Sequence, residues 1–312
     1  MEYRKAGGKD MRAGIARADL ERFRDHALAL ADEARRQLRA LFSGGFKVET
    51  KSDGSPVTSA DLAVEAKLRA MTLAAFPDHG QVGEEFPPHR PDAAFSWVFD
   101  PVDGTEDFVH RVPTFGSIVG LFFRGQPVVG VIDIPMLEDR VHAAFGLGAF
   151  RDSPVGGNER LRLADLDRAT PAMAVRVMSS APANYVRRRA DGARFDALAR
   201  AYPNLRIYRS CYMHLCAATG QTDATVDYGN PIWDIAAARI LIEEAGGAFR
   251  IVDSYELDGE RIYNAVFGRP SLVAKIAKLM LATKVKRAAK KAAARSKSPA
   301  PRKTAPKQRK RR

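Results

Sequence analysis

The chain has 312 residues and is 46% hydrophobic, which is enough for one large domain or two of ordinary size with a full apolar core. Its net charge of +13 is concentrated at one end, because residues 284–312 contain 14 Lys or Arg and no acid, whereas the remaining 36 basic and 37 acidic residues nearly balance. No apolar run approaches the roughly 18–20 residues of a membrane span, and the N-terminus lacks the apolar core of a secretory signal. We therefore expect a cytoplasmic protein with no membrane-spanning segment.

Cysteine usage agrees with that compartment. Cys211 and Cys216 are the two cysteines, and they lie five residues apart in a segment with a helical pattern. This spacing points them to different faces of a helix, so we expect no disulfide, and a single pair cannot supply a zinc site.

Two helices and a strand are expected in the first third of the chain. An amphipathic pattern predicts a helix over residues 19–42, with Asp19 as its N-cap and glycines at its end. After a polar loop over 51–56, Thr58 and Asp61 have the spacing of a capping box for a second helix that ends before Pro77. The apolar run 97–99 predicts a strand that Pro101 should end, because proline lacks an N–H and restricts the residue before it.

The remaining elements follow from shorter patterns. Strands are expected at 115–123, 127–132, 172–178, 205–208 and 223–228, with a last strand ending at Val266. Helices are expected at 196–202, 212–219, 235–245 and 270–282, the third of them opened by Trp233-Asp234. Residues 284–312 lack apolar periodicity and are predicted to be disordered. We therefore divide the chain into a polar extension (1–18), one folded domain (19–283) and a basic tail (284–312).

The stretch Asp100-Pro101-Val102-Asp103-Gly104-Thr105 carries the strongest chemical signal. Two carboxylates this close repel each other unless a cation lies between them, and oxygen ligands favour Mg²⁺ before Mn²⁺ or Ca²⁺. The Val102 carbonyl could be a further ligand, and Gly104 lets the backbone come close to a ligand. Thr105 offers an N–H and a hydroxyl where a helix could begin, which suits a phosphate. The alternative is a simple turn in which one Asp caps a helix.

This string resembles the Asp-Pro-Ile/Val-Asp-Gly-Thr signature of the inositol monophosphatase superfamily. Residues 51–61 resemble the family's first motif in the form seen in its histidinol-phosphatase branch, 82–85 its Gly-Glu-Glu motif, and 233–247 its last motif. The resemblance covers residues 20–282. It implies an α/β fold layered αβαβα, with mixed sheets between helical layers, and homodimerisation is common in such proteins.

The resemblance also implies a reaction, the hydrolysis of a small phosphate monoester by metal-activated water. Its implied ligands of two or three Mg²⁺ ions are Glu84, Asp100, Val102 through its carbonyl, Asp103 and Asp234. The hydroxyl of Thr105, paired with Glu84, would orient the attacking water. The N–H groups of Gly104 and Thr105 would hold phosphate oxygens.

Further roles are implied around this centre. Asp227 lies seven residues before Asp234, where the family carries an acid that contacts the alcohol portion of the substrate. Outer or third-metal roles fall to Lys51, Asp61 and Glu85, although helix capping alone also explains Asp61. The histidines form no Ser/His/Asp or metal-ligand pattern, so we expect all of them to be surface or satisfied residues: His26, His79, His89, His110, His142 and His214.

Histidinol phosphate is the substrate that the residues favour, and inositol 1-phosphate is the alternative. The 51–61 string and Cys211-Tyr212 resemble the histidinol-phosphatase branch, and the acids Glu106 and Asp107 could bind a cationic substrate. Ser210 departs from the branch, which has Asp there, and the segment after Gly247 lacks its Asp-Trp-x-Gly pattern.

Nucleic-acid binding through the basic tail is the alternative from another class. Fourteen positive charges without an acid suffice for salt-sensitive contacts with a phosphate backbone. A solubilising extension explains the same composition, and the absence of aromatic residues gives no sign of base stacking. A non-catalytic binding module is disfavoured by the complete acidic set.

Overall fold

A computed structural model of the chain describes residues 10–50, 56–167, 170–187 and 191–283. The predictions for Lys51 and for disorder of the tail fall outside these residues, and the domain boundaries stay predictions. Within the described part, no helix combines the length and the apolar character needed to cross a bilayer.

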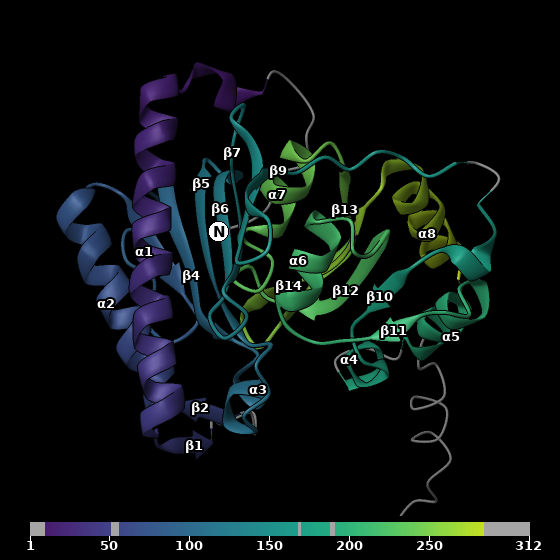
Figure 1. Cartoon of the computed structure of the whole chain (residues 1–312), viewed down its shortest axis with the longest axis horizontal. Coiled ribbons are helices and arrows are strands. Elements are labelled where there is room, and N and C mark those ends of the chain that lie inside the picture. The colour runs from purple at the N-terminus through teal and green to yellow at the C-terminus, as the bar shows by residue number, and fades with distance from the viewer. Residues whose placement is uncertain (1–9, 51–55, 168–169, 188–190, 284–312) are drawn as a thin grey trace, which may run out of the picture.

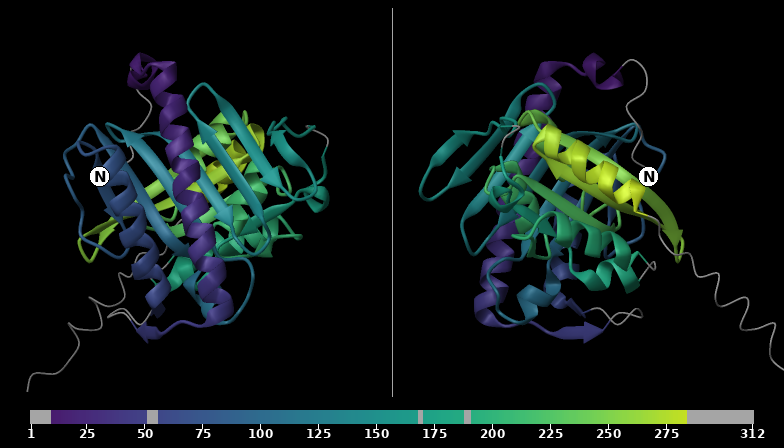
Figure 2. Two further views of the ribbon diagram at one scale, coloured as in Figure 1. Left: turned by 60° about the vertical axis from the view of Figure 1, so that its left-hand side comes forward. Right: turned by 90° about the vertical axis from the view of Figure 1, so that its right-hand side faces the viewer.

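Helices and sheets alternate in five layers, as Figures 1 and 2 show. The outer layer on one side consists of α1 (Arg17–Gly44) and α2 (Ser59–Ala75). A seven-stranded sheet, the pair α6 (Tyr212–Ala218) and α7 (Ala238–Glu244), and a five-stranded sheet follow. The last layer consists of α4 (Pro182–Arg187), α5 (Gly192–Ala201) and α8 (Pro270–Ala282). The expected αβαβα arrangement is confirmed.

The seven-stranded sheet has its strands in chain order, β3 to β9. They are β3 (Gly80–Gly83), β4 (Phe95–Asp103), β5 (Gly116–Phe123), β6 (Gln126–Ile134), β7 (Asp139–Ala144), β8 (Gly148–Ser153) and β9 (Gly157–Arg160). The β3–β4 pair is parallel and all others are antiparallel. A separate hairpin of β1 (Val48–Thr50) and β2 (Pro56–Thr58) precedes α2.

The five-stranded sheet has the order β11-β10-β12-β14-β13. Its strands are β10 (Val177–Ser179), β11 (Arg206–Ile207), β12 (Ala224–Asn230), β13 (Ala248–Leu257) and β14 (Glu260–Gly268). In the right-hand view of Figure 2, α8 lies across this sheet, and in the left-hand view α1 lies across the seven-stranded one.

Three apolar cores hold the layers together, and strand alternation assigns side chains to them. On β4, Trp97 and Phe99 face the core under α1 and α2, whereas Val98 between them faces the middle layer. Both faces of the sheet are therefore buried. The third core lies between the five-stranded sheet and the outer helices, where Ile276 and Met280 of α8 are fully buried.

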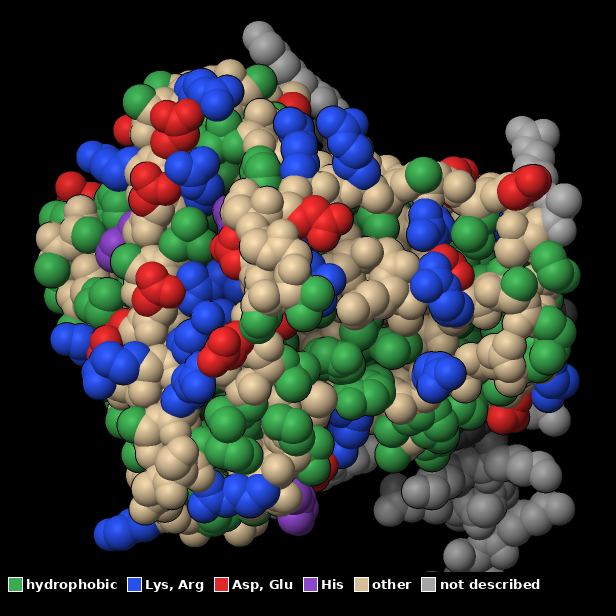
Figure 3. All heavy atoms as spheres, viewed as in Figure 1, with side chains coloured by type: hydrophobic (Ala, Val, Ile, Leu, Met, Phe, Trp, Pro, Cys, Tyr) green, Lys and Arg blue, Asp and Glu red, His purple; other side chains and the backbone are tan. Residues whose placement is uncertain are grey.

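Charge on the visible surface is mixed, as expected for a folded body whose basic and acidic residues nearly balance. Over the exposed side of α1, basic and acidic side chains alternate (Figure 3). Arg17–Glu21 and Arg36–Glu33 are ion pairs one helical turn apart on that surface.

Three predicted local features are wrong. Asp19 is not the cap of α1, because the helix begins earlier and Ala16 occupies the N-cap without a side-chain bond. The first sheet does not end at Pro101, because β4 continues to Asp103 through a bulge. The helix of the last motif begins at Ala238 rather than Ile235, since residues 232–237 form turns.

Elements expected from short sequence patterns were predicted only in part. Residues 172–174 form a 3₁₀ turn, and only 177–179 of the strand expected at 172–178 is extended. Strands β1, β2, β9 and β13 and helix α4 were not predicted. By contrast, α2 has the predicted capping box between Thr58 and Asp61, and α8 spans the predicted residues.

Candidate active site

The site begins at the carboxyl end of β3, beside the parallel strand β4. The register pairs Gly83, the last residue of β3, with Phe99, so Glu84 follows β3 next to Asp100, which is still paired within β4. The carboxyl ends of parallel strands are a common place for ligands in such sheets. The topology therefore brings together two acids that lie 16 positions apart in the sequence.

A bulge in β4 brings the second Asp of the signature to the same cleft. Asp100 pairs with Ile118 but Asp103 with Gly116, so β4 has one residue more than β5 over this stretch. Bulges re-aim side chains and tolerate proline, which explains why Pro101 does not end the strand. Asp100 and Asp103 consequently both line one cleft of about 790 Å³.

Gly104 makes the turn from β4 into the short helix α3 (Thr105–Val109). Its φ is 87°, in the left-handed region, and an added Cβ would lie 3.0 Å from the Cβ of Ser210. A side chain here would be strained and would crowd the segment that precedes α6. The glycine therefore lets the two sides of the cleft approach each other.

Asp61 connects the cap of α2 with this turn. The Thr105 hydroxyl lies 3.1 Å from Asp61 Oδ1 and 3.0 Å from the Val102 carbonyl oxygen. The other carboxylate oxygen of Asp61 accepts a hydrogen bond from the Thr58 amide at 2.8 Å. Capping and an outer role at the site were alternatives for Asp61, and the structure shows both contacts.

The other side of the cleft comes from the middle layer and the second sheet. Asp234 lies in the turns before α7, and these turns pack closely on the first sheet, since a Cβ at Gly120 would lie 2.9 Å from that of Ala236. Asp227 projects from β12. The cleft brings together these predicted residues: Glu84, Asp100, Val102, Asp103, Gly104, Thr105, Asp227 and Asp234. Residues of α3 and α4 are among those that line it, and both helices are labelled in the lower part of Figure 1.

Repulsion among the acids is the main electrostatic feature of the cleft. Burial raises the pKa of Asp100 well above its ordinary value, and the charges of Glu84, Asp103, Asp234 and Asp61 raise it further. Burial also raises the pKa of Asp103, against the opposing effects of the His214 charge and of hydrogen bonds from Cys211. Four other carboxylates thus act on the buried Asp100.

This donor set fits a divalent cation. The cleft offers carboxylate oxygens and backbone carbonyls, the kind of donor that hard cations such as Mg²⁺ prefer. Among the residues that the structure describes, no three His, Cys, Asp or Glu side chains already stand as a coordination set for one ion. The Asp103 carboxylate instead accepts a hydrogen bond from the Cys211 amide.

His214 is a residue of the cleft that the sequence did not reveal. It lines the cleft from α6, and its Nε2 lies 2.6 Å from Asp227 Oδ2. The Ser180 hydroxyl donates to the other oxygen of Asp227 at 2.7 Å. The sequence indicated only a surface or satisfied residue here and gave no sign of the cleft, because a helix and a strand bring together partners that are 13 residues apart.

The carboxylate of Asp227 is therefore engaged on both oxygens. Burial opposes its ionisation, but the bonds from His214 and Ser180 outweigh burial and leave the pKa of Asp227 below its ordinary value. Asp227 is thus ionised, and both of its carboxylate oxygens already accept hydrogen bonds from His214 and Ser180.

The acids after the signature also have partners. Arg209 Nη1 lies 2.7 Å from Glu106 Oε2, and the Thr114 hydroxyl donates to Asp107 at 2.9 Å. Arg209 itself lines the cleft. Glu106 and Asp107 consequently give less reason to expect a cationic substrate than the sequence suggested.

Comparison with known proteins places this geometry in a family. The model of the inositol monophosphatase family matches residues 19–289. The chain belongs to the inositol monophosphatase family. This membership makes it a phosphoric monoester hydrolase, and the family resemblance of its motifs is confirmed.

Relatives of this family member carry two kinds of name. It is 34% identical to a histidinol-phosphatase of Chlorobaculum parvum over 77% of this chain and 90% of that protein. It is 33% identical to a histidinol-phosphatase of Mycobacterium tuberculosis, over 73% and 86%. An inositol monophosphatase structure from Zymomonas mobilis superimposes with a TM-score of 0.70 and 26% identity, over 85% of this chain and 99% of that one.

Proposed function

We propose that this chain is a Mg²⁺-dependent phosphomonoesterase whose preferred substrate is histidinol phosphate. The observation that carries the hydrolase part is the convergence of Glu84, Asp100, Asp103 and Asp234 in one cleft, where burial and the charges of the other three raise the pKa of Asp100. Two relatives named histidinol-phosphatase, at 34% and 33% identity, support the substrate. Inositol 1-phosphate is the alternative, supported by the similarity to the Zymomonas mobilis structure.

One group of residues in the cleft would hold the metal ions that act on the phosphate. Two or three Mg²⁺ ions would be held by Glu84, Asp100, the Val102 carbonyl, Asp103 and Asp234. When bound, they supply charge neutralisation for the phosphate and a lowered pKa for water.

Three other groups complete the assignment. Glu84 accepts a hydrogen bond from the attacking water, and the Thr105 hydroxyl, anchored by Asp61, orients that water toward phosphorus. The N–H groups of Gly104 and Thr105 donate to phosphate oxygens at the start of α3. Asp227, with its partner His214, faces the alcohol portion. Glu85 lies one residue outside the ligand set.

A substrate comparison tests the assignment. With saturating Mg²⁺, kcat/KM for histidinol phosphate should exceed that for inositol 1-phosphate by about tenfold or more, because a site built for polar groups rejects analogues that leave them unpaired. Equal, poor rates on both compounds would remove each as the substrate.

Matched variants test the ligand set. Asp100→Asn and Glu84→Gln should lower kcat/KM by more than the roughly 10–100-fold that loss of an outer partner costs. Asp92→Asn makes the same chemical change on an exposed residue and should leave the rate unchanged. A fully active Asp100→Asn enzyme would refute the assignment.

The basic tail supports a separate proposal, nucleic-acid binding. Its 14 Lys or Arg residues, without an acid, would contact a phosphate backbone in a salt-dependent way. Retention on DNA-cellulose at moderate salt should fall when residues 284–312 are removed. Identical elution of the two proteins would exclude this role.

Two expectations rest on the resemblance and the composition alone. A homodimer would sediment at about twice the chain mass of 34.2 kDa, and a monomer would exclude it. A cytoplasmic location is tested by fractionation of the cells that make the protein.

A further inference from the structure

Helix α2 contains a buried ion pair that faces the loop carrying Glu84. The Glu65 side chain has no exposed surface and that of Arg69 is 14% exposed, and Arg69 Nε lies 2.7 Å from Glu65 Oε1. Burying a charge is costly unless it is paired and hydrogen-bonded, and replacing such a pair by apolar residues is often neutral. The stability of the fold alone therefore does not explain this pair.

Both members of the pair bind the backbone just after Glu84. The Glu85 amide donates to Glu65 Oε2 at 2.9 Å. Arg69 Nη2 donates to the Phe86 carbonyl at 2.9 Å, and its Nη1 donates to the Pro87 carbonyl at 3.1 Å. Three consecutive residues of the loop are thus tied to one helix by charge-assisted hydrogen bonds.

The residue before Glu84 is shaped by the same pair. A Cβ at Gly83 would lie 2.1 Å from Glu65 Oε1, so any larger residue would displace the buried carboxylate from its place against the strand end. The base of the loop is closed by Gln81 and His89, whose backbone groups exchange two hydrogen bonds of 2.8 Å. Glu84 therefore lies between the paired residue Gln81 and the backbone of residues 85–87, which is hydrogen-bonded to α2.

We propose that Glu65 and Arg69 are positioning residues for Glu84: they fix the loop so that the Glu84 carboxylate stays beside Asp100 and raises the affinity for a divalent ion. Neither side chain lines the cleft. The inference rests on the proposed function, in which Glu84 is an ion ligand. A ligand on a fixed backbone costs less ordering entropy on binding than one on a free loop.

Glu65→Gln in the full chain is the first test, because Gln is nearly isosteric but carries no charge and so cannot form an ion pair with Arg69. Glu33→Gln is the matched control, since Glu33 also pairs with an arginine on a helix, at 2.6 Å, on α1 away from the cleft. Hydrogen exchange without added metal should be about tenfold faster for the Glu85 amide in Glu65→Gln only. The dissociation constant for Mn²⁺, measured by electron paramagnetic resonance, should rise about 10–100-fold in Glu65→Gln only.

Parallel variants separate the two ways in which this can fail. If Glu84→Gln binds Mn²⁺ as the unaltered chain does, the proposed ligand set fails, whatever Glu65 does. If Glu84→Gln weakens Mn²⁺ binding but Glu65→Gln does not, the inference is overturned, even where exchange at Glu85 is faster. Should circular dichroism show that Glu65→Gln is unfolded, Arg69→Lys takes its place. It keeps the charge but loses the forked contacts to residues 86 and 87, and the same two outcomes decide.

Discussion

The hydrogen bond between His214 and Asp227 fixes the tautomer of the imidazole. Asp227 has a lowered pKa and accepts at 2.6 Å, so His214 Nε2 is the donor, and in the neutral form of the imidazole Nδ1 has the free lone pair. Within the described residues, no hydrogen-bond partner is found for this buried Nδ1. A substrate hydroxyl or ammonium group would be a matching donor.

Exchanging Asp227 for Asn should reverse this arrangement. The Asn amide can donate to Nε2 and so move the imidazole proton to Nδ1, which should lower kcat/KM by about 10–100-fold. Nitrogen NMR of His214 would show the new tautomer. Ser180→Ala is the control, because it removes the other bond to Asp227 but keeps the carboxylate. An unchanged tautomer in Asp227→Asn would contradict the assignment.

His79 predicts a pH dependence of stability. Burial, followed by the charge of Arg22, lowers its pKa from 6.5 to about 4, and the Trp97 indole N–H donates to its Nδ1 at 3.0 Å. Between pH 6.5 and 4 the unfolded chain therefore binds more protons at this residue than the folded one, so the free energy of unfolding falls as pH falls.

Urea denaturation at pH 7.0, 5.5 and 4.5 measures this effect. His79→Gln should flatten the loss of stability, by less than the full pKa shift implies, because the ring is only about half buried. His110→Gln changes an exposed histidine and should leave the pH profile as it is. Parallel profiles for the two variants would argue against His79.

Single residues were predictable where the chemistry was local. Asp100 and Asp103 stand in one string, and their proximity alone indicates a cation. His214 and Glu65 were not predictable in the same way, because their partners lie 13 and 20 residues away and no short motif joins them. Their roles depend on how a helix packs against a strand or a loop.

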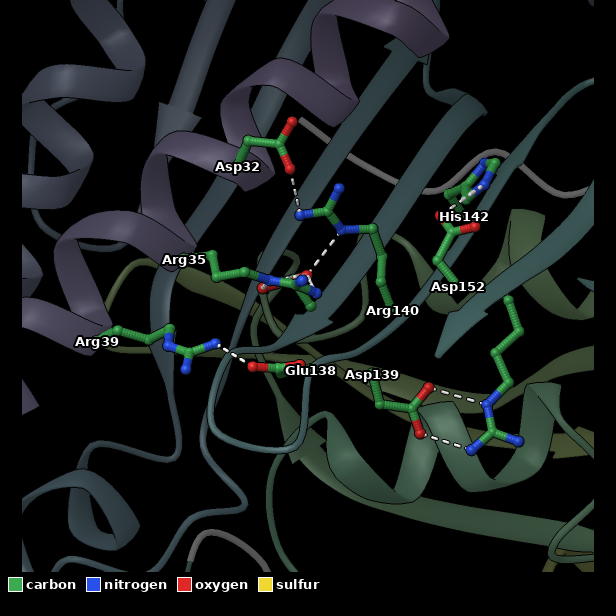
Figure 4. Close-up of polar contacts among 10 residues, drawn as sticks. Asp32, Arg35, Arg39, Glu138, Asp139, Arg140, His142 and Asp152 are labelled. Carbon is green, nitrogen blue, oxygen red and sulfur yellow. Dashed lines mark hydrogen bonds and ion pairs between the residues drawn. The ribbon is translucent and has the colours of Figure 1, made fainter. Parts of the chain in front are cut away.

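Ion pairs also join whole elements, and Asp133 is the centre of one such contact. Figure 4 labels Asp32, Arg35 and Arg140, which take part in it. This buried side chain on β6 lies 2.5 Å from Arg35 of α1 and 2.7 Å from Arg140 of β7. Arg140 also reaches Asp32 of α1 at 2.7 Å. The contact fastens the outer helix to two strands of the first sheet.

Asp133→Ala should therefore destabilise the fold by about 3 kcal/mol, because it leaves the buried Arg140 and the partly buried Arg35 without their shared partner. Glu138→Gln is the comparison, since its ion pair with Arg39 is about half exposed and should contribute far less to stability than the buried contact. Urea denaturation at pH 7 measures both. An equal decrease in the free energy of unfolding for the two variants would show that burial does not determine how much these ion pairs stabilise the fold.

Elements with long periodic patterns were predicted best. α1, α2 and α8 have apolar positions at helical spacing, and their existence and type are correct. β4 was predicted to end too early, because the proline rule takes no account of a bulge. The start of α7 was placed too early because Trp233 and Asp234 have the composition of a helix start but adopt turns.

At the scale of the molecule, cation binding should be coupled to folding. An ion that binds the acids of the cleft only in the folded state stabilises it, by about 2.7 kcal/mol at a concentration 100 times its Kd. MgCl₂ should therefore raise the Tm of the unaltered chain, and EDTA should reverse the effect.

Asp100→Asn provides the control for this coupling, because it removes the most buried of the acids. Its Tm without Mg²⁺ should be equal to or above that of the unaltered chain, since repulsion is relieved, and Mg²⁺ should change it little. Scanning calorimetry measures both quantities. The same Mg²⁺-induced rise in the two proteins would place the ion elsewhere.

The order of the layers could not be derived from periodicity or composition. Neither pattern tells that α6 and α7 lie between two sheets, and only the resemblance implied it. Long-range pairings such as β12 with β14, rather than with its neighbour in sequence, are set by packing of the whole chain.

The cleft draws its two halves from different sheets. Glu84 follows β3 and Asp100 and Asp103 lie on β4 of the first, whereas Asp227 belongs to the second. In the proposed function, substitutions on β12 and α6 would change which alcohol is released and leave the acids at the phosphate unaltered. Substrate specificity and the hydrolysis of the phosphate ester could then evolve at separate rates within the same fold.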